Sequence, residues 1–296
     1  MRLALIANPH SGTAPEPADL EARLRADGAQ VTSVSIEEIA DEEDGDLEAG
    51  AVAALTADGR PDRIVVAGGD GSIGPAALCA AKIGVPLAVV PVGTANDFAR
   101  AKELPLDLDE ACALARDPSA TIAHAELGLA GERPFVNAAA AGLSVAAAQA
   151  AKPHKSRLGP LAYTLGALKA GATAPTLRCT IAADGRETYK GGAWQVVVAV
   201  TGAFGGGSEI GGTRDDDGLI DVAVVPAGSR AGLVRRAYAM RAGKLAGQDD
   251  VPHERGRVIE VEIDGHPTFN VDGETCRCEP GHFTLHDDGF DVVVAS

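Results

Sequence analysis

The chain has 296 residues, enough for one large domain or two ordinary ones, and 46% of them are hydrophobic, which allows a sizeable core. Its formal net charge of −16 argues against nucleic-acid binding and against general adhesion to an anionic membrane, because both need basic surface. No stretch approaches the ~18 apolar residues of a membrane-spanning helix. The five cysteines give an odd count and no disulfide framework, so we expect the reducing cytoplasm.

The first 124 residues alternate strand and helix patterns. Strands are predicted over residues 2–8, 29–36, 62–70 and 85–93, and helices over 16–28, 71–84 and from 94 onward. The acidic stretch 37–50 predicts a loop leading into a helix. Near-continuous Val, Ile and Leu content indicates strands that are covered on both faces. We therefore expect an α/β domain with a doubly wound parallel sheet over residues 1–124.

From residue 125 to 296 the pattern changes to strands separated by turns, with helical insertions near 158–171 and 230–246. The strands are predicted over residues 133–143, 176–192, 193–202, 218–228, 257–265, 266–274 and 290–296. Asp184-Gly185 is typical of a two-residue hairpin turn. We expect a β-rich sandwich domain here, with the last strand as a candidate to return to the first domain.

A glycine-rich loop follows the strand at 62–70. It contains Gly68, Gly69, Asp70, Gly71 and Ser72. Backbone N–H groups at such a strand–helix junction bind phosphate oxygens, and glycine lets them approach a ligand closely. Ser72 is a candidate helix cap. A tight turn without any ligand explains the same glycines, so this loop alone leaves both interpretations open.

A second loop of this kind follows the next strand. It contains Gly93, Thr94, Asn96 and Asp97, with Arg100 one helical turn later. Asn96 or Asp97 alone indicates no more than a helix cap, and Arg100 alone a solvated side chain. Because the carboxyl ends of neighbouring parallel strands border one crevice, the two loops together favour a nucleotide site, with Arg100 near a phosphate.

These two loops, GGDGS and PVGTANDFAR, resemble motifs of the diacylglycerol kinase catalytic domain, in its branch of soluble bacterial lipid kinases and sphingosine kinase relatives. Further similar segments follow in family order at residues 8–12 (NPHSG), 155–163 (KSRLGPLAY), 205–222 (GGGSEIGGTRDDDGLIDV) and 270–274 (NVDGE). The resemblance therefore covers nearly the whole chain.

The resemblance implies ATP-dependent phosphorylation of a hydroxyl of diacylglycerol or a related lipid. It implies an NAD kinase- or phosphofructokinase-like first domain and a nucleotide cleft between the two domains. It makes Asp272 the base for the acceptor hydroxyl, Glu274 a partner for Mg²⁺ or for that base, and Asp217 a ligand of a structural Mg²⁺. From position alone, Asp272-Gly273 indicates a solvated hairpin turn and the run 215–217 an acidic turn. The residues that the resemblance assigns to ATP binding are Asn8, Gly12, Gly68, Gly69, Asp70, Gly71, Ser72, Gly93, Thr94, Asn96, Asp97 and Arg100.

Two departures from the family pattern keep other functions open. The sequence TAPEP after Gly12 lacks the Lys or Arg that the family usually has there, and Thr201-Gly202 stands in place of Asn-Gly. One alternative is a catalytically weak protein that binds nucleotide or lipid. The other is an NAD kinase-like or other small-molecule kinase, which also uses a G-G-D-G loop.

A basic cluster interrupts the otherwise acidic sequence at Lys152, His154, Lys155 and Arg157. It is a candidate contact with the inner face of an anionic membrane, and a solvated loop is the alternative. For partners, we expect a lipid substrate and no nucleic acid, and we leave a homodimer open.

Overall fold

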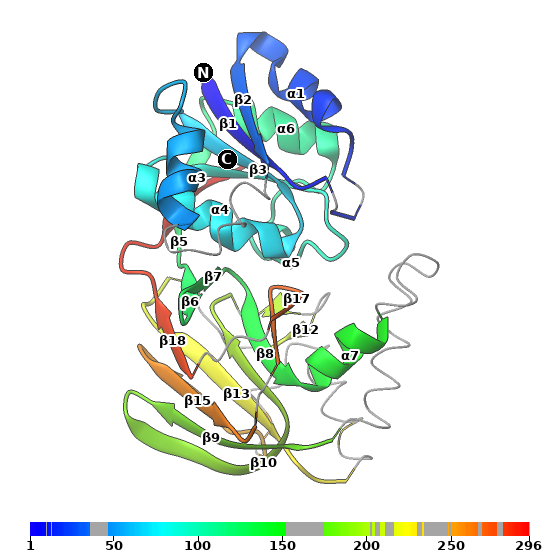
Figure 1. Cartoon of the computed structure of the whole chain (residues 1–296), viewed down its shortest axis with the longest axis vertical. Helices are drawn as coiled ribbons and strands as arrows, with labels where there is room; N and C mark the ends of the chain where they lie inside the picture. The colour runs from blue at the N-terminus through cyan, green and yellow to red at the C-terminus, as the bar shows by residue number, and fades with distance from the viewer. Residues whose placement is uncertain are drawn as a thin grey trace. The chain divides into compact units, whose positions relative to one another are not determined.

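The computed structural model describes residues 1–295 except 10, 13, 36–46, 152–174, 202, 205–207, 211–215, 230–232, 234–247, 249, 266–267 and 277–280. The chain divides into two compact units (Figure 1): residues 1–127 together with 287–296, and residues 128–286. The basic cluster at 152–157, Asp215, and nearly all of the helices predicted at 158–171 and 230–246 lie outside the described residues.

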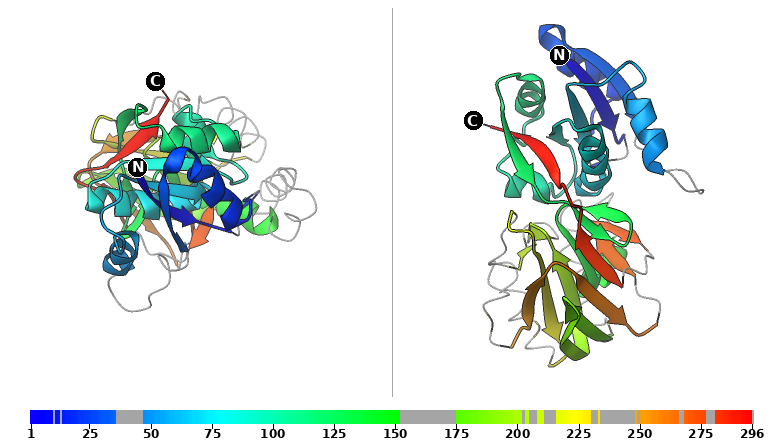
Figure 2. Two further views of the ribbon diagram at one scale, coloured as in Figure 1. Left: turned by 90° about the horizontal axis from the view of Figure 1, so that it is seen from above. Right: turned by 90° about the vertical axis from the view of Figure 1, so that its left-hand side faces the viewer.

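The first unit contains a six-stranded sheet in the order β2-β1-β3-β4-β19-β5. Its strands are β1 (Arg2–Ala7), β2 (Gln30–Ser35), β3 (Arg63–Gly68), β4 (Leu87–Pro91), β5 (Thr121–Ala125) and β19 (Phe290–Val294). All neighbours are parallel except β19 and β5, which lie side by side in Figure 2 as a red and a green strand. The predicted parallel sheet is confirmed, and the strand at the end of the chain lies within it.

Helices cover both faces of this sheet. They are α1 (Pro17–Leu24), the 3-10 turn η1 (Ala26–Gly28), α3 (Leu47–Leu55), α4 (Asp70–Ile83), α5 (Asp97–Ala101) and α6 (Leu108–Arg116). Helices α1 and α6 bury Leu20 and Cys112 against one face, where Leu5 and Val65 point. Helix α4 packs on β3, β4 and β19, and the alternate residues Ile64 and Val66 are fully buried as well. Coverage on both faces explains the near-continuous apolar strands.

The strand order of the first unit fixes where its loops emerge. Strand β1 pairs with β2 on one side and with β3 on the other, so the direction of chain progression reverses between β1 and β3. Ligands of open α/β sheets bind outside the carboxyl ends of the strands at such a switch point. The segments 8–12 and 68–70 leave the sheet there, and the segment 92–96 follows β4 at the same edge.

The second unit is an antiparallel sheet. Its strands are β6 (Gly128–Ala130), β7 (Arg133–Phe135), β8 (Ala138–Gly142), β9 (Leu177–Ala183), β10 (Arg186–Ala199), β13 (Ile220–Pro226), β14 (His253–Gly256), β15 (Ile259–Ile263), β16 (Phe269–Val271), β17 (Glu274–Cys276) and β18 (His282–Leu285). A separate pair is formed by β11 (Ala203–Phe204) and β12 (Ser208–Glu209), and one helix, α7 (Leu143–Ala151), follows β8. The sequence predicted a single strand over 133–143 and no helix at α7.

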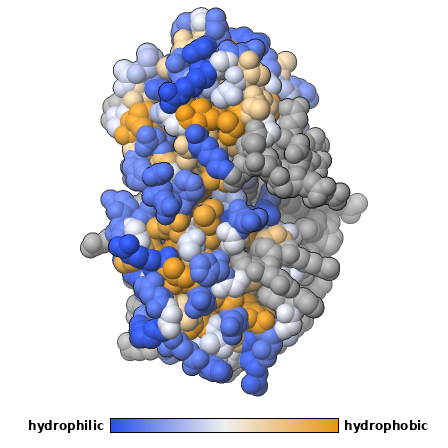
Figure 3. Space-filling model, turned by 60° about the vertical axis from the view of Figure 1, so that its left-hand side comes forward, coloured by the Kyte–Doolittle hydropathy of each residue, from blue (hydrophilic) through white to orange (hydrophobic). Residues whose placement is uncertain are grey.

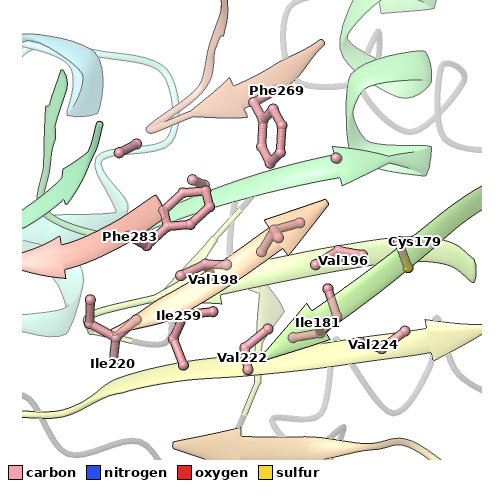
Figure 4. Close-up of a cluster of buried hydrophobic side chains, with 14 of the residues drawn as sticks. Cys179, Ile181, Val196, Val198, Ile220, Val222, Val224, Ile259, Phe269 and Phe283 are labelled. Atoms are coloured by element: carbon pink, nitrogen blue, oxygen red, sulfur yellow. The ribbon is translucent and has the colours of Figure 1, made fainter. Parts of the chain in front are cut away.

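The long strand β10 lets this sheet curl around one core. Residues 186–193 of β10 pair with β9, whereas residues 195–199 lie between β8 and β13. The enclosed side chains include Ile181, Val198, Val222, Phe269 and Phe283, all nearly inaccessible to solvent (Figure 4). The predicted β-rich, sandwich-like domain is therefore confirmed. Its aliphatic and alanine content follows from the shortage of aromatic residues in the sequence.

The surface and the cysteines add two observations. On the face drawn in Figure 3, hydrophilic residues are interspersed with hydrophobic ones, and within the described residues no helix has the length and apolarity to cross a membrane. Cys79, Cys112 and Cys179 are buried free thiols, while Cys276 is disulfide-bonded. Burial raises the pKa of Cys79 and of Cys179 to about 11.

Candidate functional site

Three loops of the first unit meet at the carboxyl edge of its sheet, and glycines let them touch. A methyl group on Gly93 would lie 2.5 Å from Cα of Gly69, and one on Gly12 would lie 2.9 Å from the carbonyl oxygen of Val92. Both distances are too short for any side chain. At these positions, therefore, the missing side chains make room for neighbouring loops of the protein itself.

Ser72 and Asn8 join the first two loops. The Nδ2 amide of Asn8 donates to Oγ of Ser72 at 3.0 Å, and Ser72 is only 3% exposed. A methyl group on Gly68 would lie 2.6 Å from that same Oγ. Helix α4 begins at Asp70, with Gly69 as its N-cap residue and no side-chain capping bond. The prediction that Ser72 caps this helix is wrong, because its hydroxyl bonds Asn8 instead.

Asp70 joins the second loop to the third. It is the first residue of α4, and its Oδ1 accepts a hydrogen bond at 2.9 Å from the backbone N–H of Phe98 in the first turn of α5. The side chain therefore ties the starts of two helices together. The second residue of α4 is Gly71, so the N–H groups at the positive end of this helix belong to the GGDGS segment.

Asn96 shapes the third loop from within. It adopts a left-handed backbone with φ 54°, and its Oδ1 accepts from the N–H of Gly93 at 2.9 Å. Its Nδ2 donates to the carbonyl of Gly93 at 3.2 Å, so one amide closes the turn and does not cap α5. Asp97 is buried, Thr94 is exposed, and the exposed Arg100 donates from Nε to the carbonyl of Ala95 at 3.1 Å.

The structure thus brings all twelve predicted nucleotide residues into these three loops and the helix starts that follow them. The arrangement offers backbone N–H groups, the N-terminus of α4 and the guanidinium of Arg100. Such groups bind phosphate oxygens in proteins.

In the second unit, Asp272 lies in the two-residue turn between β16 and β17. Asp272 and Gly273 have φ values of 46° and 88°, as a type I′ hairpin turn requires. Asp272 as a whole is only 8% exposed. Its Oδ2 accepts from the N–H of Val136 at 2.7 Å, and its Oδ1 accepts from those of Asn137 and Ala138 at 3.0 Å each.

This carboxylate is therefore held by three successive backbone amides. Three N–H donors fit the ionised form of the side chain, because an ionised carboxylate only accepts hydrogen bonds. From its position alone, Asp272-Gly273 was interpreted as a solvated hairpin turn. The hairpin turn is present, but its aspartate is buried. A buried, fixed and ionised carboxylate can take a proton from a bound alcohol.

Glu274 lies two residues further on, at the start of β17, and is more exposed. Its Oε2 accepts from Nη2 of Arg133 on β7 at 2.9 Å, and its side chain is 57% exposed. The sequence did not single out Arg133. The pair adds a cation and an anion at the surface next to the Asp272 turn, where the carboxylate of Glu274 remains accessible to solvent.

Asp217, predicted as a metal ligand, binds a guanidinium. Its Oδ1 accepts from Nη2 of Arg255 at 2.8 Å, and Nε of Arg255 donates at 3.2 Å to Asp221, whose side chain is fully buried. Nε2 of His253 lies 2.6 Å from the other oxygen of Asp221. Burial acts to lower the pKa of Arg255, but Asp217 and Asp221 raise it, and the net pKa lies above the ordinary value.

A metal ion at Asp217 would have to compete with the guanidinium of Arg255. The carboxylates of Asp217 and Asp221 already face a permanent cation, and within the described part of the chain no three His, Cys, Asp or Glu side chains gather to hold a metal. Asp215 lies outside that part. The structural Mg²⁺ that the resemblance implies at Asp217 therefore stays a prediction, and in this structure Asp217 faces the guanidinium of Arg255.

Comparison with known proteins agrees with these motifs. A family model described as "Diacylglycerol kinase catalytic domain" matches residues 2–126, and one described as "YegS C-terminal NAD kinase beta sandwich-like domain" matches residues 137–294. The chain belongs to the diacylglycerol kinase family. Membership makes it an ATP-dependent lipid kinase, as the GGDGS, GTANDFAR and DGE motifs predicted.

Similar members of the diacylglycerol kinase family come from several bacteria. A "Probable lipid kinase YegS-like" of Pseudomonas fluorescens is 31% identical over 76% of this chain and 77% of its own length. A "Diacylglycerol kinase" of Staphylococcus saprophyticus is 27% identical over 95% of this chain and 92% of its own. The crystal structure of a diacylglycerol kinase from Bacillus anthracis has the same fold, with a TM-score of 0.74 at 22% identity over 99% and 96% of the two chains.

Proposed function

We propose that this kinase transfers the γ-phosphoryl group of ATP to the free hydroxyl of diacylglycerol or a closely related neutral lipid. The observation that carries the proposal is the buried carboxylate of Asp272, which three backbone amides hold in place. An alcohol needs a positioned base to accept its proton as the phosphoryl group arrives. Asp272 performs this step, and its fixed position makes the proton transfer direct.

The nucleotide binds at the three loops of the first unit. The N–H groups at the start of α4 bind phosphate oxygens, and Arg100 supplies the positive charge that the sequence lacks after Gly12. Asp70, Asn96 and Ser72 act by holding these loops in shape, through the bonds to Phe98, Gly93 and Asn8.

Mg²⁺ enters with the nucleotide. Kinases usually hold this ion by one or two carboxylates together with substrate phosphates, so a cage made only of protein is not required. Glu274 is the carboxylate that we assign to it, because its side chain is exposed and lies two residues from the base. When bound, the ion neutralises charge on the transferring phosphoryl group.

The acceptor is a lipid, so the enzyme works at a membrane surface. We assign this contact to Lys152, His154, Lys155 and Arg157, which offset the acidic charge of the chain locally. This assignment rests on the sequence alone, because the cluster lies outside the described residues.

A panel of acceptors tests the function. The purified protein is incubated with γ-labelled ATP, Mg²⁺ and, in separate reactions, diacylglycerol, monoacylglycerol, sphingosine or ceramide in mixed micelles, or NAD. We expect label on diacylglycerol, and none when Asp272 is replaced by Asn. Transfer to NAD alone would contradict the proposal, and so would ATP binding without transfer to any acceptor.

A further inference from the structure

The segment 136–138, which holds Asp272, consists of two residues outside the regular strands and Ala138, the first residue of β8. It connects β7 to β8, and three successive N–H groups in it point to one carboxylate. The hairpin is also tied in the other direction, because the N–H of Asp272 donates to the carbonyl of Ala138 at 3.0 Å. The position of the carboxylate therefore depends on what fixes the backbone of this short segment.

Asn137, the middle residue, is anchored to the end of β10. It is 2% exposed, and its carbonyl accepts from the N–H of Val200 at 2.9 Å. Its side-chain Oδ1 accepts from Oγ1 of Thr201 at 3.1 Å. Its own N–H donates to Asp272. One buried residue thus connects β10 to the carboxylate through its backbone and its side chain.

Thr201 occupies the position at which the sequence departs from the family pattern, Asn-Gly having been replaced by Thr-Gly. Both asparagine and threonine carry a hydrogen-bond donor on a short side chain. In this chain the threonine hydroxyl provides that donor to Asn137. The departure therefore keeps the hydrogen-bonding capacity that the position requires.

Resting on the proposed role of Asp272, we infer that Thr201 and Asn137 are a pair of positioning residues. The hydroxyl of Thr201 orients Asn137, and the backbone around Asn137 directs the three N–H groups toward the carboxylate. Neither residue is required to touch the substrate. Removing the hydroxyl takes this hydrogen bond away from a buried amide oxygen, so Asn137 and its segment are held less firmly. A displacement of about 1 Å at a reacting group can lower a rate by about 100-fold.

The test removes and restores the hydroxyl. Thr201→Val keeps the shape of the side chain and removes the donor, while Thr201→Ser and Thr201→Asn keep a donor. We expect Thr201→Val to lower kcat at least tenfold, with KM for ATP within twofold of the unchanged protein, and Ser and Asn to stay within about threefold of it. The acid limb of the pH profile of kcat should move to higher pH in Thr201→Val, because less well aimed amides stabilise the ionised base less.

Thr188→Val is the matched control. Thr188 lies in β10, the strand that ends two residues before Thr201, and its hydroxyl donates to the carbonyl of Ile181 at 3.4 Å, away from the Asp272 turn. Thr188→Val should lose as much stability as Thr201→Val does, but its kcat and the pH profile of kcat should stay unchanged. Thr201→Ala repeats the test if the valine variant does not fold.

Three results would overturn the inference: an unchanged kcat in the folded variant without a hydroxyl, a loss that Ser does not restore, or an equal loss in Thr188→Val. The inference and the proposed function fail separately. Retained turnover in Asp272→Asn removes the base, whereas an inactive Asp272→Asn beside a fully active Thr201→Val removes only the positioning pair.

Discussion

Two hairpins of the second unit are built on the same dipeptide and differ in what surrounds it. Asp184-Gly185 joins β9 to β10 with φ values of 50° and 76°, and Asp272-Gly273 joins β16 to β17 with 46° and 88°. In both, the aspartate carboxylate accepts backbone N–H groups. Asp184 uses one oxygen, Oδ1, for the N–H groups of Arg257 and Val258, and it is exposed.

Asp272 uses both oxygens for three donors and is buried. The comparison separates two roles of one residue type. At Asp184 the side chain holds the backbone of a turn. At Asp272 the backbone holds the side chain, and the carboxylate is fixed where a base can act.

The largest expected effect comes from changing both aspartates in the same way. In Asp272→Asn the amide NH₂ must face a backbone N–H, because both oxygens are in use. We expect transfer to fall by about 100- to 10,000-fold and stability by about 1–3 kcal/mol, with ATP binding retained. Asp184→Asn keeps its accepting oxygen and should change stability by less than about 0.5 kcal/mol and leave transfer intact. Initial rates, ATP titration calorimetry and urea denaturation measure these quantities.

A third aspartate extends the comparison, because Asp221 is held by cations and not by amides. Arg255→Met leaves a fully buried carboxylate whose one remaining side-chain partner within the described residues is His253, and should cost about 3 kcal/mol. Arg186→Met is the control, since Arg186 forms an exposed pair with Glu254 on the same strand as Arg255 and should cost less than about 1 kcal/mol.

The same urea denaturation, repeated with a chelator, tests whether a divalent metal ion binds at Asp217, as the resemblance implies. Because Arg255 supplies the positive charge at Asp217, removal of divalent ions should leave the midpoint of the unchanged protein where it is. A midpoint that falls on chelation would show that a metal ion stabilises this unit after all.

Asp70 resembles Asp184 in that its carboxylate serves the backbone. Asp70→Ala breaks the bond to the N–H of Phe98, so the third loop is no longer tied to α4, and the Kd for ATP should rise about tenfold, which is ~1.4 kcal/mol. Asp70→Asn keeps an accepting oxygen and should raise the Kd less than threefold. An equally large loss in both variants would mean that the negative charge, and not the tie, is what the nucleotide site needs.

The smallest effect is expected from the two turn glycines. No heavy atom lies within 4 Å of a methyl group on Gly185 or on Gly273, so Ala at either position suffers only from its positive φ. Each substitution should cost about 1–2 kcal/mol. Turnover should fall only in Gly273→Ala, because only that turn carries the proposed base. Equal turnover in the two variants would argue that small shifts of Asp272 are tolerated.

The sequence predicted much of this architecture from patterns that act locally. Near-continuous apolar runs identified the parallel sheet, and motif order identified the family and predicted a role for Asp272. The Asp-Gly dipeptide alone could not distinguish Asp272, because Asp184-Gly185 shows the same hairpin pattern. Glycine at 69 and 93 was predicted to admit a phosphate, but which atoms approach it depends on loops far apart in the chain.

Other features depend on contacts that a single sequence does not display. The partner of Asp217 is Arg255, 38 positions away, and no sequence pattern in either segment indicates this pairing. Asn137 was missed, although one signal was there: it is a polar residue within the apolar run FVNAAAA. A lone amide in such a run has to be satisfied by hydrogen bonds when it is buried.

Strand β19 has a consequence for the order in which the molecule can form. It lies between β4 and β5 in the first sheet, and Phe290 packs 6.1 Å from Phe98, yet it is synthesised after every residue of the second unit. During synthesis the edge of β4 therefore has no β19 to pair with until the end of the chain has been made. The second unit, in contrast, has its whole sequence available before the first unit does. The first unit is thus the first to be started and the last to be completed.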